Sequence, residues 1–238
     1  MSASNFLEKV LTARVYDVAI ESPLDSMPVI SQRLDNRVLL KREDLQPVFS
    51  FKLRGAFNKV FQVVRDNPAT KAVITASAGN HAQGVSLAAK KLQINAIIVM
   101  PLTTPLIKVN AVKSYGAKVV LRGDNFDEAY KYSLQLAAQE KLAFIHPYDD
   151  IDVMAGQGTI ALEIIRQHPD DIEAIFVPVG GGGLLAGILG FLKIVKPSIK
   201  IIGVEPEDAA CLAAAMQAKR RVKLKEVGIF ADGVAVRQ

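Results

Sequence analysis

The sequence predicts an α/β protein of two units, each with a parallel sheet between layers of helices. Two observations support this. From residue 72 to residue 146, short apolar runs alternate with amphipathic segments of helical length, and no hairpin signal separates the strands. A second series with the same alternation runs from residue 153 to residue 219. Because strands that alternate with helices pair in parallel under two helical layers, we expect two three-layer αβα units that meet near residues 147–155.

Each element has its own local signal. Apolar residues at helical spacing from Phe6 to Val18 predict an opening helix, and Pro23 and Pro28 interrupt the pattern before a short strand at 38–41. Later helices are expected at 53–65, 81–91, 106–115, 126–140, 153–167, 184–196 and 208–219. Later strands are expected at 72–75, 96–100, 118–121, 143–146, 174–179 and 200–204.

Composition excludes several classes of protein. Half of the 238 residues are hydrophobic and 22% are charged, which excludes intrinsic disorder. The net charge is +5, but the basic cluster at 219–225 has no interleaved aromatic residue, so we expect no nucleic-acid partner. The uncharged stretch 175–192 contains Pro178 and six glycines, which favours a buried strand, turn and helix over a membrane span.

The single cysteine and the first residues bear on the compartment. Cys211 cannot form an internal disulfide, and we interpret it as a small buried hydrophobic residue in an Ala-rich helix. Charges at Glu8, Lys9 and Arg14 precede any long apolar run, so we expect no signal peptide and a cytoplasmic protein.

The first chemical motif is Ser-Phe-Lys-Leu-Arg-Gly-Ala at 50–56, where Lys52 stands between apolar residues at the start of a predicted helix. Burial and the positive end of the helix dipole both lower the pKa of an amine, which favours the free base that a Schiff base requires. The alternative to a Schiff-base lysine is a structural one, in which the aliphatic part of the side chain lies along the start of an amphipathic helix and the amine stays in solvent.

The second motif, Thr-Ala-Ser-Ala-Gly-Asn-His at 75–81, leads from a predicted strand into a helix. Small residues allow several backbone N–H groups to converge, which makes a site for a carboxylate or phosphate at the helix N-terminus. An N-cap by Ser77 or Asn80 explains half of this run but not its succession of small residues. His81 is most simply a residue of the helix start, and we do not interpret it as catalytic.

The third motif is four consecutive glycines at 180–183, again between a strand and a helix. A turn alone does not require four glycines, so we expect the backbone here to approach a ligand closely, most simply a phosphate. The frame Gly181-x-Gly183-x-x-Ala186 also matches a dinucleotide fingerprint, with Glu205 placed for a ribose. A nicotinamide-dependent dehydrogenase is therefore an alternative.

The three motifs in this order resemble those of pyridoxal-phosphate enzymes with the tryptophan-synthase-β-like fold, and among them the serine/threonine dehydratases. The stretches 38–44 (Val-Leu-Leu-Lys-Arg-Glu-Asp) and 230–236 (Phe-Ala-Asp-Gly-Val-Ala-Val) add to the resemblance, which runs from about residue 16 to residue 238. It implies a larger cofactor-binding domain formed by 1–65 and 153–238, a smaller α/β domain formed by 66–152, and a cofactor cleft between them.

The resemblance also implies residue roles. Lys52 would carry pyridoxal 5'-phosphate as a Schiff base, Asn80 would bond its phenolic oxygen, and Phe51 would pack on its ring. The cofactor phosphate would be held by Gly180, Gly181, Gly182, Gly183 and Leu184, and the substrate carboxylate by Ser77, Ala78, Gly79, Asn80 and His81. We assign no metal ligand.

The activity that the resemblance implies is deamination of L-threonine to 2-oxobutanoate and ammonia, a step of isoleucine biosynthesis, with L-serine as a further substrate. The related serine racemases resemble this pattern but carry a second Ser where Ala78 stands. Alanine cannot move a proton, which favours elimination over racemisation. We expect a homo-oligomer with a small-molecule substrate and no membrane partner.

The resemblance further implies that the catalytic domain continues beyond Gln238, so we interpret the sequence as C-terminally truncated. An inactive truncated paralogue or an interaction protein is accordingly the second alternative.

Overall fold

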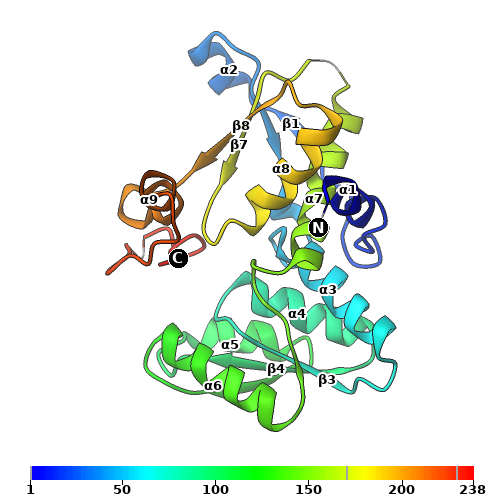
Figure 1. Ribbon diagram of the computed structural model, residues 1–238, viewed down its shortest axis with the longest axis vertical. Coiled ribbons are helices and arrows are strands. Elements are labelled where there is room, and N and C mark those ends of the chain that lie inside the picture. The colour runs from blue at the N-terminus through cyan, green and yellow to red at the C-terminus, as the bar shows by residue number, and fades with distance from the viewer. Residues whose placement is uncertain (1, 170, 229) are drawn as a thin grey trace.

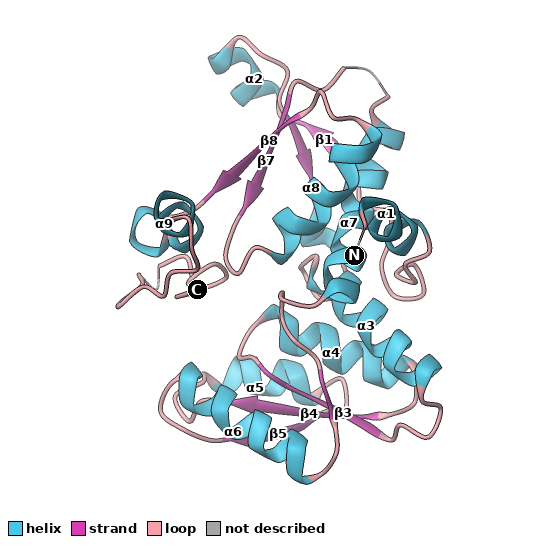
Figure 2. Ribbon diagram, viewed as in Figure 1, coloured by secondary structure: helices cyan, strands magenta, loops and turns pink. Residues whose placement is uncertain are grey.

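The computed structural model describes residues 2–169, 171–228 and 230–238, and helices alternate with strands along most of the chain (Figures 1 and 2). Its largest sheet has four parallel strands in the order β5-β4-β3-β6. These strands are β3 (Ala72–Ala76), β4 (Asn95–Met100), β5 (Lys118–Leu121) and β6 (Ala143–Phe144), and the helices between them are α4 (Asn80–Lys91), α5 (Leu106–Lys113) and α6 (Phe126–Gln139).

Neighbouring side chains along these strands enter different cores, as the alternation of a strand requires. Val73 and Ile98 pack with α4, α5 and Phe57 of α3 (Lys52–Asp66) on one face of the sheet. Ile74 and Ile97 pack with α6 on the other face. The first expected three-layer unit is therefore confirmed.

The second unit contains two parallel strands, β7 (Ala174–Pro178) and β8 (Lys200–Val204). Helices α1 (Ala3–Leu11), α7 (Ile151–Gln167) and α8 (Gly183–Val195) pack against one face of this pair. On the other face, Phe176 is 66% exposed and Val204 is 48% exposed. Among the described residues, the expected second three-layer unit thus has two layers, because only alternate side chains of its strands meet helices.

The N-terminal region differs most from the sequence-based expectation. The opening helix ends at Leu11, so Val15 and Val18 lie beyond it. Pro28 does not interrupt structure but begins a helix, α2 (Pro28–Leu34), at the position where a missing N–H is tolerated. On either side of α2, β1 (Leu24–Ser26) and β2 (Leu39–Lys41) pair antiparallel. At the other end of the chain, the expected last helix divides into a 3-10 turn and α9 (Cys211–Ala218).

Helices α3 and α7 lie between the four-stranded sheet and the β7–β8 pair, as Figure 1 shows. The two helices are in backbone contact: a methyl group at Gly156 would lie 2.7 Å from the Cα of Gly55. This contact joins the two halves of the molecule next to the predicted site. In the part of the chain that the structure describes, no helix is long and apolar enough to cross a membrane.

Candidate active site

Lys52 is the first residue of α3, and its amine points into the protein. Its backbone N–H donates to the Ser50 hydroxyl at 3.2 Å, which fixes the turn into the helix. Its Nζ donates to the carbonyl of Pro147 at 3.0 Å and lies 5.6 Å from the centre of the Phe51 ring. Burial lowers the pKa of Lys52 to about 8, so a useful fraction of the amine is uncharged near neutral pH.

The loop at 77–79 connects β3 to the N-terminus of α4. The Ser77 hydroxyl accepts the N–H of Gly79 at 3.2 Å, so this side chain braces the loop instead of capping the helix. Gly79 is the N-cap residue and supplies no side-chain bond, and the Asn80 side chain is exposed. The first-turn N–H groups of a helix lack intrahelical partners, so this terminus can accept an anion.

His81 is buried, with 3% of its surface exposed, and serves the joint between strands and helix. Its Nε2 lies 3.1 Å from the carbonyl oxygen of Ile145, which also accepts the hydroxyl of Thr75 at 2.7 Å. Burial, with a smaller contribution from Lys52, lowers the pKa of His81 to about 3, so the ring is neutral and Nε2 carries its proton. The Nε2 side of the imidazole is thus bonded to the backbone, while the buried Nδ1 has no hydrogen-bond partner among the described residues.

The glycine loop leads from β7 into α8, and its glycines have different surroundings. Gly182, the N-cap of α8, has φ +83°, and a methyl group built there would meet nothing within 4 Å. Methyl groups at Gly181 and Gly183 would instead collide with Tyr148, and one at Gly180 would lie 3.1 Å from the Cα of Val234. Three of the four glycines therefore have a packing reason inside the chain, which the sequence analysis did not anticipate, and the expected approach of a ligand stays a prediction.

A fourth loop, which the sequence analysis did not single out, brings the others together. Pro147 accepts the amine of Lys52, and Tyr148 packs on Gly181 and Gly183. The next turn is closed by His146, whose Nδ1 accepts the N–H of Asp149 at 2.8 Å. The sequence held a signal for this segment: it follows a predicted parallel strand, and ligand sites gather at the carboxyl ends of such strands.

These residues fit pyridoxal phosphate. Lys52 offers a buried amine of lowered pKa beside an aromatic ring. The start of α8 offers backbone N–H groups next to open space at Gly182, as a phosphate requires. The 147–148 segment contacts both groups, through the Pro147 carbonyl and the Tyr148 side chain, so the amine and the start of α8 lie near the same segment.

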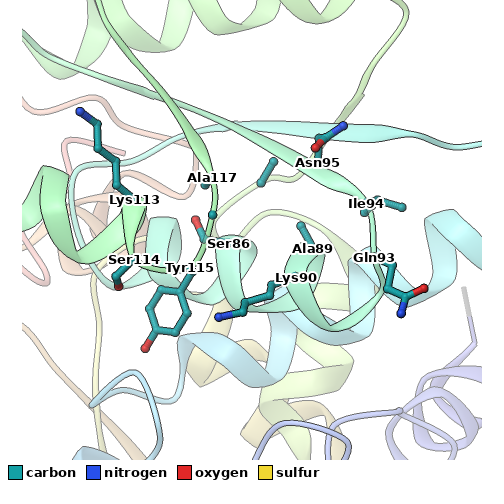
Figure 3. A pocket seen from close by; sticks show the side chains of 12 residues that line it. Ser86, Ala89, Lys90, Gln93, Ile94, Asn95, Lys113, Ser114, Tyr115 and Ala117 are labelled. Carbon is teal, nitrogen blue, oxygen red and sulfur yellow. The ribbon is translucent and has the colours of Figure 1, made fainter.

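Two other features do not belong to this site. Glu205 accepts the N–H groups of Leu212 and Ala213, each at 2.9 Å, so its carboxylate caps α9 and is not free for a ribose. A hollow of about 420 Å³, lined among others by Lys90, Lys113 and Tyr115, lies at the C-terminal ends of α4 and α5 (Figure 3). It opens beside the first residue of β4, at the edge of the sheet opposite the candidate site.

Comparison with known proteins identifies the class. The family described as pyridoxal-phosphate dependent enzyme matches residues 15–238, and the chain belongs to this family. The nicotinamide alternative is not supported.

Within this family the chain is similar to biosynthetic threonine dehydratases. It is 53% identical over 240 residues to the biosynthetic L-threonine dehydratase of Burkholderia multivorans, covering 100% of this chain and 47% of that protein. It is 56% identical over 232 residues to the chloroplastic biosynthetic threonine dehydratase 1 of Solanum lycopersicum, covering 98% and 38%. The chain thus spans less than half the length of these curated relatives.

Solved structures agree with the fold. The processed form of threonine deaminase isoform 2 from Solanum lycopersicum superposes with a TM-score of 0.95 at 52% identity, covering 99% of this chain and 68% of that one. Maize serine racemase superposes with a TM-score of 0.91 at 33% identity, covering 98% and 70%. The tryptophan-synthase-β-like fold expected from the sequence is confirmed.

Proposed function

We propose that this chain is the cofactor-binding part of a threonine dehydratase, which removes the β-hydroxyl of L-threonine as water. Hydrolysis of the released enamine then gives 2-oxobutanoate and ammonia. The observation that carries the proposal is the Lys52 amine, buried against the Pro147 carbonyl with a pKa of about 8. The similarity to biosynthetic threonine dehydratases supports the choice of substrate and a place in amino-acid biosynthesis, that of isoleucine. L-Serine is the second candidate substrate.

The cofactor-holding residues follow from the site. Pyridoxal phosphate, when bound, supplies an electron sink for negative charge at the α-carbon of an amino acid. We assign its aldehyde to Lys52 and its phosphate to the loop 180–184, where the first-turn N–H groups of α8 and the open space at Gly182 support the assignment. Phe51 would pack on its ring, and the exposed Asn80 amide would bond its phenolic oxygen.

The substrate-holding residues are assigned to the loop 77–81. N–H groups at the start of α4 would bind the substrate carboxylate, aided by the helix dipole. The neutral His81 ring keeps the joint with Ile145 intact without adding charge. The free Lys52 amine, buried in this position, has a pKa of about 8, which is suited to accepting a proton from the α-carbon near neutral pH.

Ala78 supports elimination over racemisation. A racemase needs a second group that moves a proton on the opposite face of the α-carbon, and a methyl side chain cannot serve. Since maize serine racemase has nearly the same fold, fold alone does not decide this point.

The proposal is tested by incubating the protein and pyridoxal phosphate with L-threonine or L-serine. The expected result is release of 2-oxoacid and ammonia, faster from L-threonine, and none from a Lys52→Ala variant. Chiral chromatography of the remaining amino acid measures racemisation. Formation of D-serine without 2-oxoacid would contradict the proposal, and so would the absence of any product from protein that carries the cofactor.

We also propose the wider organisation. A larger domain of 1–65 and 153–238 and a smaller one of 66–152 are supported by separate cores around the β7–β8 pair and the four-stranded sheet, although α3 contributes to the core of the smaller one. A homo-oligomer is supported by exposed Val29 and Leu34 on α2, at 69% and 64% exposure.

A further inference from the structure

A buried cluster of charges lies on the side of α3 that faces away from the candidate site. Arg54 follows Lys52 by two residues, about 200° around a helix. Its guanidinium and the carboxylate of Glu163 on α7 are both fully buried. Glu43 and Lys41, from the N-terminal region, complete what is called the Arg54 cluster below.

The Arg54 guanidinium forms bidentate hydrogen bonds with the carboxylates of Glu43 and Glu163. Its Nε and Nη2 donate to the two oxygens of Glu43, both at 2.8 Å. Its Nη1 and Nη2 donate to the two oxygens of Glu163, at 2.5 and 3.0 Å. Two bidentate pairs fix the position and the plane of the guanidinium, which a lysine ammonium cannot reproduce.

Lys41 is the second cation of the cluster, and the contacts within the cluster favour the charged forms of Glu163 and Arg54. Lys41 Nζ lies 2.6 Å from Glu163 Oε2, so two cations face two carboxylates. Although burial alone would raise it, bonds from Arg54 and Lys41 hold the pKa of Glu163 below its usual range. Burial also opposes the charge on Arg54, but Glu43 and Glu163 hold its pKa above the ordinary value.

The cluster acts at the contact between α3 and α7. A methyl group at Gly156 would lie 2.7 Å from the Arg54 carbonyl, and the Gly55 N–H donates to Gln157 at 3.2 Å. Helix α7 begins at Ile151, only four residues after Pro147, the acceptor of the Lys52 amine. The rotation and height of α3 against α7 therefore set where the amine stands relative to that acceptor.

A purely stabilising role explains this arrangement less well. Burying ions is expensive, and apolar side chains of similar volume are often as stable as a buried ion pair. Double fork bonding fixes the orientation of the guanidinium in addition to any energy it adds. We propose that Arg54, held between Glu43 and Glu163, is a positioning residue that sets the Lys52 amine against the Pro147 carbonyl for reaction with the cofactor aldehyde. This rests on the proposed role of Lys52.

The test compares Arg54→Lys with Arg65→Lys, a control in the same helix whose side chain is 59% exposed. The first readout uses no cofactor: the rate of acetylation of Lys52 by acetic anhydride is followed against pH by peptide mass spectrometry. The wild type and the control should show a midpoint near 8, and Arg54→Lys a midpoint higher by about one pH unit, since a displaced amine regains solvent. Urea denaturation establishes that each variant is folded under the labelling conditions.

The second readout is the rate at which pyridoxal phosphate attaches to Lys52, trapped by borohydride. Arg54→Lys should slow attachment by at least about tenfold, because a displacement of ~1 Å can cost a positioned reaction on the order of 100-fold. If Arg54→Lys does not fold, Glu163→Gln, which keeps size and can still accept bonds, replaces it with the same expected directions.

Wild-type acetylation midpoint and attachment rate in a folded variant of lowered stability would overturn the proposal, because they would leave Arg54 a structural role only. If pyridoxal phosphate does not attach to Lys52 even in the wild type, the proposed function fails. The acetylation midpoint still decides the positioning role in that case.

Discussion

The buried amine of Lys52 predicts how its replacement changes stability. Burial lowers the pKa of Lys52 from 10.5 to about 8, so below pH 8 the folded protein holds a charge that water would solvate better. At about 1.4 kcal/mol per pH unit, this charge costs about 3 kcal/mol of folding free energy at pH 7. Lys52→Met removes the charge and keeps the stem, but leaves the Pro147 carbonyl unpaired, which costs about 1 kcal/mol. The cofactor-stripped variant should therefore be more stable than wild type by about 2 kcal/mol at pH 7.

The sign of the pH dependence follows from linkage. The folded pKa of Lys52 lies below the unfolded value, so between pH 8 and pH 10.5 the unfolded state binds more protons. Wild-type stability consequently gains on that of the variant as pH rises through this interval. By pH 10 the cost of the charge falls below about 1 kcal/mol, so the wild type overtakes Lys52→Met or equals it.

Urea denaturation followed by circular dichroism at pH 7, 8.5 and 10 measures the difference between the two proteins. Titration of all other groups cancels in this difference. Lys91→Met, at an exposed position of α4, controls for the loss of one positive charge. A difference that stays constant from pH 7 to pH 10, or a variant less stable than wild type at pH 7, would show that the buried charge of Lys52 does not destabilise the fold.

Three further substitutions have defined outcomes. Gly182→Asp should weaken pyridoxal phosphate binding at least about tenfold in an absorbance titration. The backbone at φ +83° disfavours a side chain, and the new carboxylate would repel the cofactor phosphate. Unchanged affinity would place the phosphate elsewhere. Gly181→Ala should lower the free energy of unfolding by about 1–3 kcal/mol, because its methyl group collides with Tyr148; Tyr148→Ala in the same chain should recover part of the loss, and no recovery would exclude this contact as the cause. Glu163→Gln should show a smaller loss of stability between pH 5 and pH 3 than wild type, since a depressed carboxyl pKa gives stability that is lost as pH falls through it; equal losses in acid denaturation would contradict this.

The parallel α/β series could be predicted from the sequence because its signals are local. The strands 118–121 and 200–204 match β5 and β8 at both ends, since apolar runs between turn residues bound them. The N-terminal region could not be predicted in the same way. A proline such as Pro28 can either interrupt a segment or begin a helix, and the sequence does not distinguish the two cases. The pairing of β1 with β2 depends on tertiary contacts.

The sequence motifs predicted the loops of the candidate site but not the contacts between them. Motifs identified Lys52 and the loops before α4 and α8, because unusual residues stand at helix starts. The tie between them, the Pro147 carbonyl, is a backbone atom that any residue would supply. The pairing of Arg54 with Glu163 joins residues 109 positions apart, and a short motif carries no information about such a partner.

Borohydride reduction in the presence of pyridoxal phosphate, followed by peptide mapping, shows directly whether Lys52 is the lysine that carries the cofactor. We expect one pyridoxyl adduct, on the peptide that contains Lys52, and loss of the Schiff-base absorbance after reduction. An adduct on another lysine, or none on protein shown to be folded, would contradict the assignment of Lys52 as the cofactor lysine.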